Sequence, residues 1–134
     1  MNYGFVKVAA AVPHVKVADC FYNIQQIEGL MRQASQKEVQ IIAFPELSVT
    51  SYTCMDLFSQ ETLLRNAEKA LLDLVNNTAD LDLLTIVGCP LVSGSQLINA
   101  AVAFQRGEIL GVVPKSYLPS YKEFQEEQIG RASC

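Results

Sequence analysis

The stretch Ile41-Ile42-Ala43-Phe44-Pro45-Glu46-Leu47 decides how the chain folds and where its chemistry lies. With Val39 before it, this stretch is an apolar run broken only by Gln40, which is typical of a strand inside a covered parallel sheet. Glu46 follows the run directly. A carboxylate at the end of a buried strand is costly unless it is paired or used. Glu46 is therefore the first candidate for a functional residue.

A second segment repeats this arrangement with the opposite charge. Pro114-Lys115-Ser116-Tyr117-Leu118-Pro119-Ser120-Tyr121 follows the apolar run at 109–113, so the ammonium of Lys115 stands behind another predicted strand. A prolyl bond beside each charged residue fixes the local chain direction. We expect Glu46 and Lys115 to belong to one site. Their charged groups should then emerge at the same end of the sheet, about 4–6 Å apart.

Size and composition indicate one compact globular domain. The chain has 134 residues, of which 50% are hydrophobic and 18% charged, and no interior linker or repeat divides it. A net charge of −4 without a basic block argues against a nucleic-acid partner. No apolar run approaches the roughly 18–20 residues that span a bilayer, and the stretch after Lys7 is too short for a secretory signal. These features predict a cytoplasmic protein that does not bind membranes.

The cysteines and the single histidine show no metal-binding spacing. Cys20, Cys54, Cys89 and Cys134 are widely scattered, and His14 stands alone beside a proline. No C-x-x-C pair or zinc signature results, so neither a metal nor a cofactor site is predicted. Free thiols in a reducing compartment are expected in place of a disulfide framework.

Hydrophobic periodicity predicts the order β-α-β-loop-α-β-β-β. Strands are expected at residues 4–12, 39–44, 83–88, 96–105 and 108–113, the third closed by Pro90. One helix should begin at the N-cap Asp19, and a second should end near residues 76–78. Their apolar stripes are Cys20, Ile24, Ile27, Met31 and Ala34, and Leu64, Ala67, Leu71 and Leu74. Residues 48–58 form the loop, and Arg106-Gly107 joins the last two strands as a hairpin. This is an α/β layered fold with a mixed sheet, parallel at first and antiparallel at the hairpin.

Several of these segments together resemble the carbon–nitrogen hydrolases of the nitrilase superfamily. They are residues 6–12, 41–47, Thr50-Ser51-Tyr52, Asp56-Leu57-Phe58, Asn99-Ala100-Ala101 and 115–126. More narrowly, they look like the N-terminal glutaminase domain of glutamine-dependent NAD(+) synthetases. The resemblance implies an αββα sandwich, of which this chain would be the first half. Residues 1–127 would form a partial glutaminase domain, followed by an unrelated tail at 128–134.

The resemblance also implies a mechanism and its residues. A cysteine attacks the side-chain amide of glutamine, with Glu46 as the general base and Lys115 stabilising the tetrahedral intermediate. Tyr121, Tyr52 and Glu123 fall on positions that line or support the glutamine pocket. These roles suit the residue types, because a thiol needs a base to take its proton and an oxyanion needs a fixed positive donor.

Two departures from the family pattern bear on activity. Ser51 stands where the family usually has glycine, and a positive φ there would strain it by roughly 1–2 kcal/mol. The family's nucleophilic cysteine lies well beyond the lysine, and none of the four cysteines here has that context. Cys54 lies in the loop after Glu46, where nothing nearby would lower its pKa. We therefore expect the chain to be a fragment that is inactive by itself.

The resemblance also implies a role for this domain within an intact synthetase. An intact synthetase would pass ammonia to an ATP-dependent domain that amidates deamido-NAD, so ATP and magnesium are implied only for that domain. Intact family members are expected to be homo-oligomeric. Two alternatives stay open: another amidase or nitrilase of the superfamily, and a non-catalytic interaction module that keeps only the fold. Such a module would expose an apolar sheet face and would need a partner.

Overall fold

A computed structural model describes residues 4–16, 19–46, 48–50, 60–93 and 96–116, with the backbone alone described at 60, 93, 96, 97, 115 and 116. The elements in chain order are β1 (Val8–Ala10), α1 (Cys20–Gln36), β2 (Ile41–Ala43), α2 (Gln60–Asn77), β3 (Leu84–Ser93), β4 (Gln96–Gln105) and β5 (Glu108–Ser116). The strands form one sheet in the order β1-β2-β3-β4-β5. β1, β2 and β3 are parallel, and β4 and β5 continue the sheet antiparallel. The predicted α/β class and mixed sheet are confirmed.

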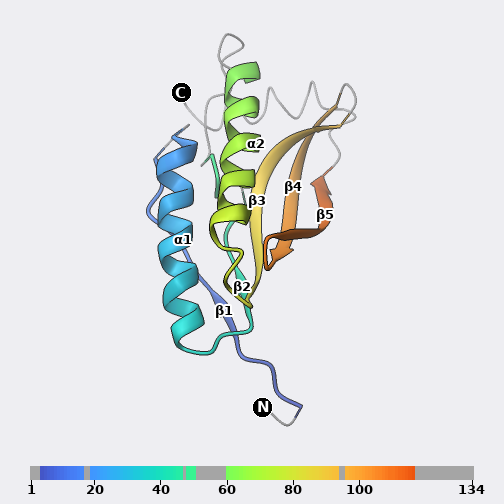
Figure 1. The fold of residues 1–134 in the computed structure, drawn as a ribbon. Coiled ribbons are helices and arrows are strands. Elements are labelled where there is room, and N and C mark those ends of the chain that lie inside the picture. Colours follow the sequence, from blue (N-terminus) through green and yellow to red (C-terminus); the bar gives the residue numbers. More distant parts are fainter. Residues whose placement is uncertain (1–3, 17–18, 47, 51–59, 94–95, 117–134) are drawn as a thin grey trace.

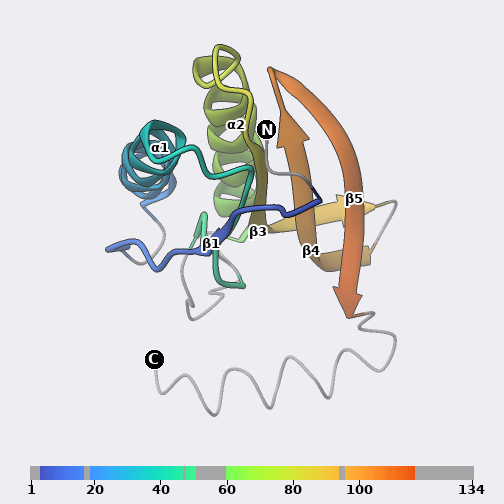
Figure 2. The same cartoon turned by 90° about the horizontal axis from the view of Figure 1, so that it is seen from below.

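Both helices lie on the same side of the sheet (Figures 1 and 2). β1 to β2 and β2 to β3 are parallel connections that proceed in one direction along the sheet. Crossovers of this kind share one hand as a rule, which places both helices on one side. Val102 and Phe104 of β4 are buried in the core, so Asn99, Ala101 and Ala103 between and before them belong to the opposite face. The core includes Ile24, Ile27, Met31, Ile42, Leu71, Leu74, Val87, Val102 and Phe104. The opposite face therefore carries no described helix, and the exposed valines Val8 and Val113 lie on its outer strands.

The first helix begins where the sequence predicts. The carboxylate of Asp19 accepts a hydrogen bond from the backbone N–H of Tyr22 at 3.1 Å, which makes Asp19 the N-cap. The predicted apolar stripe from Cys20 to Ala34 is buried. An additional polar residue, Asn23, lies fully buried on the same face. The helix thus packs as expected, with one asparagine inside the core that needs an explanation.

A two-residue turn joins β4 to β5, as predicted. Arg106 and Gly107 both have positive φ, 52° and 80°, which is the backbone of the turn type preferred in tight hairpins. A Cβ added at Gly107 would lie 2.9 Å from the Cβ of Ala79, so glycine is also required by the close approach of the loop after α2. Arg106 pairs with Asp82 at 2.7 Å and ties the turn to the start of β3.

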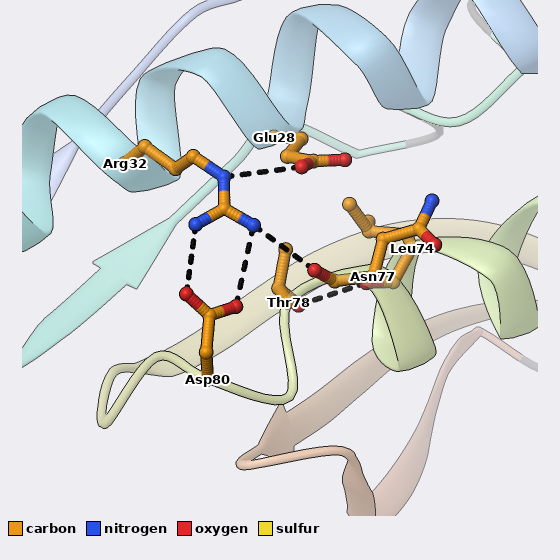
Figure 3. Close-up of polar contacts among 6 residues, drawn as sticks. All are labelled: Glu28, Arg32, Leu74, Asn77, Thr78 and Asp80. Atoms are coloured by element: carbon orange, nitrogen blue, oxygen red, sulfur yellow. Dashed lines mark hydrogen bonds and ion pairs between the residues drawn. The ribbon is translucent and has the colours of Figure 1, made fainter.

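Arg32, near the C-terminal end of α1, binds residues at and just after the C-terminal end of α2 (Figure 3). Its guanidinium binds both carboxylate oxygens of Asp80, at 2.9 and 3.3 Å, and donates to the carbonyl of Asn77 at 3.0 Å. Glu28, one turn earlier on α1, orients the guanidinium through Nε at 3.1 Å. These contacts connect α1 to the segment that leads from α2 into β3.

Four strand predictions are corrected in their ends. β1 and β2 are only three residues long, because their pairing extends only from Val8 opposite Ile41 to Ala10 opposite Ala43. β3 does not close at Pro90 but continues to Ser93. β2 pairs with β3 only as far as Ile86, so a proline beyond that point removes no hydrogen bond on the β2 side. β5 likewise runs past Val113 to Ser116 and includes Lys115.

Candidate active site

The topology brings Glu46, Asn99 and Lys115 to one edge of the sheet. Glu46 follows the carboxyl end of β2, and Lys115 lies near the carboxyl end of β5, which runs in the same direction. β4 runs the opposite way, so Asn99, near its beginning, reaches the same edge. The carboxyl ends of parallel strands are where α/β sheets commonly hold their sites. β2 and β5 are not neighbours, however, because β3 and β4 lie between them.

The turn that carries Glu46 is fastened to β3 by backbone and side-chain hydrogen bonds. The N–H of Val49 donates to the carbonyl of Gly88 at 3.1 Å, and the N–H of Gly88 donates to Oγ of Ser48 at 3.3 Å. Within the turn, the N–H of Ser48 donates to the carbonyl of Pro45 at 3.2 Å. Ser48 and Val49 are buried, so these bonds are shielded from water. These bonds hold the backbone on both sides of Glu46, at Pro45 before it and at Ser48 and Val49 after it.

Asn23 of α1 holds the same turn from the other direction. Its Nδ2 donates to the carbonyl of Val49 at 2.8 Å and to that of Lys16 at 2.9 Å, and its Oδ1 accepts from the N–H of Lys16 at 2.7 Å. This explains the buried asparagine on the helix stripe: every described polar atom of its amide has a partner. One side chain thereby joins the segment after β1, the helix and the turn of Glu46.

The side chain of Glu46 is in contact with β4. Nδ2 of Asn99 donates a hydrogen bond to Oε1 of Glu46, across 53 residues of sequence. Glu46 is half-buried. Within the part of the chain that the structure describes, Oδ1 of Asn99 is the one buried side-chain polar atom without a hydrogen-bond partner. The carboxylate thus reaches over β3 to a residue two strands away.

A β-bulge lies beside this contact. Ala100 pairs with Pro114 and Asn99 pairs with Ser116, so Lys115 is the additional residue of the β5 strand. Bulges re-aim side chains and are common beside active sites. Proline has no N–H to donate to the strand ladder, so in strands it is confined to edges and to irregularities such as this one. The backbone of Lys115 is therefore adjacent in register to the residue that contacts Glu46.

The remaining predicted site residues lie outside the described residues. These are Tyr52, Tyr121 and Glu123, together with Ser51, and the side chain of Lys115. Their roles, and the spacing of about 4–6 Å between the charges of Glu46 and Lys115, stay predictions.

Two of the four cysteines are described, and neither is suited to act as a nucleophile. Cys20 and Cys89 are free and buried. Burial raises the pKa of Cys20 to about 11 and the pKa of Cys89 to about 12, with the charges of Asp19 and of Glu68 contributing in the same direction. The thiolate is the reactive form, so both thiols are inert at neutral pH. Cys54 and Cys134 lie outside the described residues.

The described ranges show no feature typical of a metal site or a membrane span. There, no group of three or more His, Cys, Asp or Glu side chains gathers closely enough to hold a metal ion, and His14 is exposed. None of the described helices is long and apolar enough to cross a bilayer.

Asn23 and Asn99 are the two residues at this site whose contacts with Glu46 or its turn the sequence analysis does not predict. A signal for each was present. Asn23 interrupts the apolar stripe between Cys20 and Ile27, and Asn99 interrupts an apolar run in β4 although asparagine is a poor strand former. A polar residue on a face that must be buried implies a hydrogen-bonding partner.

Comparison with known proteins agrees with this arrangement. A glutamine-dependent NAD(+) synthetase of Mycobacterium bovis is 41% identical over 127 residues, which are 95% of this chain and 19% of that protein. The solved synthetase from Cytophaga hutchinsonii has a TM-score of 0.75 at 22% identity, covering 84% of this chain and 19% of that one. An amidase from Nesterenkonia sp. AN1, with acrylamide added at its active site cysteine, has a TM-score of 0.68 at 18% identity over 85% of this chain and 45% of its own.

The two solved structures establish the fold, and the chain spans about a fifth of the length of the curated relatives it matches. A family model described as carbon-nitrogen hydrolase matches residues 7–132, a range that includes Glu46, Asn99 and Lys115. The resemblance drawn from the sequence is thereby confirmed, and the chain belongs to the carbon–nitrogen hydrolase family.

Proposed function

We propose that Glu46 is the general base, and Lys115 the oxyanion-stabilising cation, of a site that hydrolyses the side-chain amide of glutamine. The observation that carries the proposal is the 41% identity, over 95% of the chain, to a protein whose name states its dependence on glutamine. The contact that holds the carboxylate of Glu46 at the sheet edge supports it. So does the position of Lys115 at a bulge of the same edge.

In this proposal Glu46 transfers two protons in succession, first from the thiol to the leaving nitrogen and then from water to the sulfur. A cysteine sulfur attacks the amide carbon while Glu46 takes the thiol proton, and the carbonyl electron pair becomes an oxyanion stabilised by the Lys115 ammonium. Glu46 then gives the proton to the amide nitrogen as the carbon–nitrogen bond breaks. Ammonia leaves and a thioester remains. Water attacks the thioester with Glu46 as base, the proton returns to sulfur, and glutamate is released.

The nucleophile of this reaction is neither Cys20 nor Cys89, because both thiols are buried and their pKa values are raised to about 11 and about 12. Cys54 lacks the family context for this role. We therefore expect the 134 residues by themselves to release no ammonia from glutamine. A cysteine supplied by further sequence or by another chain would complete the site.

The remaining parts of the proposal concern the pocket and the whole protein. Tyr52 and Tyr121 would wall the glutamine pocket, and Glu123 would support it. The ammonia would serve an ATP-dependent amidation of deamido-NAD, a reaction in which ATP and magnesium belong to separate sequence and not to these residues. The protein would be a cytoplasmic homo-oligomer that binds neither nucleic acid nor membranes.

The test is ammonia release by the protein expressed from its natural gene with its natural flanking sequence. Glutamine should be hydrolysed in preference to asparagine and acetamide. Glu46→Gln should lower kcat by about 10²–10⁴-fold and Lys115→Ala by about 10²–10³-fold. Glu108→Gln and Lys37→Ala, which change exposed charges elsewhere, serve as matched controls. Preference for acetamide would indicate a different amidase, and full activity of both site variants would refute the assignment.

A further inference from the structure

Asn99 occupies a position where an asparagine is unfavourable for stability. It lies in β4 among apolar neighbours, and asparagine is depleted in strands. Its Oδ1 is buried without a partner within the described residues, and an unpaired buried carbonyl costs about 1–3 kcal/mol. A valine would suit the strand better and leave no such atom. The stability of the sheet therefore does not explain the amide.

The amide does make one specific contact, to the carboxylate of Glu46. Hydrogen bonds to an ionised group are roughly twice as strong as those between neutral groups, and they fix the direction of the acceptor. The backbone before and after Glu46 is already held by β3 and by Asn23. The contact with Asn99 holds Oε1 of the side chain itself and so fixes the direction of this carboxylate oxygen. An amide is also neutral and keeps its protons, so it holds the carboxylate without competing in proton transfer.

We propose that Asn99 is a positioning residue for the general base. Its Nδ2 donates to Oε1 of Glu46 and directs the carboxylate toward the sheet edge that carries Lys115. Because Asn99 pairs in register with Ser116, the same residue also links this contact to the bulge at Lys115. The inference rests on the proposed function, since orienting Glu46 matters for catalysis only if Glu46 is the base.

The first readout tests the contact without any need for activity. In the 134-residue chain labelled with ¹⁵N-asparagine, the side-chain amide signals of Asn99 and Asn23 are compared between wild type and Glu46→Gln. The Asn99 signals should move and those of Asn23, which binds backbone carbonyls, should stay. Both sets unmoved would overturn the proposal. This variant leaves Asn99 itself intact, so the readout does not depend on how substitutions of Asn99 fold.

The second readout is kinetic and uses the protein expressed from its natural gene. Asn99→Asp keeps the shape of the side chain, removes the donor and sets a second carboxylate against the first. It should lower kcat for glutamine about 10–100-fold with KM changed less than about threefold, the pattern of a lost transition-state interaction. Asn76→Asp, an exposed asparagine of α2, is the matched control. A kcat within twofold of wild type would overturn the positioning role. Absence of ammonia release from a wild type that is supplied with the cysteine nucleophile would instead refute the proposed function, while the amide signals still decide the contact.

Discussion

Replacing Asn23 by alanine tests the anchor of the Glu46 turn most sharply. The substitution removes three hydrogen bonds, two to the backbone of Lys16 and one to the carbonyl of Val49. The Val49 carbonyl is deep in the core, and leaving it unpaired costs about 1–3 kcal/mol. The two bonds to Lys16 are partly accessible to water and contribute about 0.5–1.5 kcal/mol each. The free energy of unfolding should therefore fall by about 2–6 kcal/mol.

The assay is urea unfolding followed by far-UV circular dichroism, with the free energy extrapolated to water. Asn76→Ala is the matched control, because Asn76 is an exposed residue of α2, and it should change the free energy by less than about 0.5 kcal/mol. A loss below about 1 kcal/mol for Asn23→Ala would refute the reasoning. It would mean that the turn of Glu46 holds its place without the helix.

Three further outcomes follow from the fold. Gly107→Ala should destabilise the chain by more than about 1 kcal/mol, because Gly107 has a positive φ and an added Cβ would lie close to Ala79. Gly29→Ala, in α1 with open space around it, should instead stabilise the chain by about 0.5–1 kcal/mol. Equal effects of the two substitutions in urea unfolding would contradict this. The hydrogen bonds from Arg32 hold the pKa of Asp80 below its ordinary value of 3.8, so their stabilisation is present above that pH and is lost as the pH falls through the lower folded-state value. The urea midpoint of Asp80→Asn should accordingly fall less than that of wild type on acidification, and parallel declines would disprove the linkage. The Cys89 thiol, with a pKa of about 12, should react with a disulfide reagent only after denaturation, and rapid labelling of the native chain at this residue would count against its burial.

The parts of the fold that depend on local pattern could be predicted from the sequence. The stripe of α1 and its cap at Asp19 are set by spacing of 3.6 residues per turn, and the hairpin is set by Arg106-Gly107. The strand ends could not be predicted in this way. Pro90 is compatible with β3 only because β2 stops pairing before it, which is a property of the neighbouring strand.

At the candidate site, too, the residues marked by local pattern could be predicted and the long-range contacts could not. Glu46 and Lys115 were predicted because each follows an apolar run and matches a family segment. Asn99 was not predicted as a partner of Glu46, because the contact spans 53 residues and crosses over β3. No periodicity encodes which loop bends over which strand. The hydrogen bond from Asn23 to the turn of Glu46 cannot be predicted for the same reason. The position of Asn23 on the buried stripe shows only that this polar residue needs partners.

The central claim is that Glu46 and Lys115 form one site, and a crystal structure of the protein tests it most directly. The distance to measure joins the nearest carboxylate oxygen of Glu46 to Nζ of Lys115. We predict about 4–6 Å, with both groups on the face of the sheet where Asn99 contacts Glu46. Finding the two groups on opposite faces of the sheet, or separated by a packed helix, would contradict the claim. The chain would keep its family, and the assignment of base and cation would be lost.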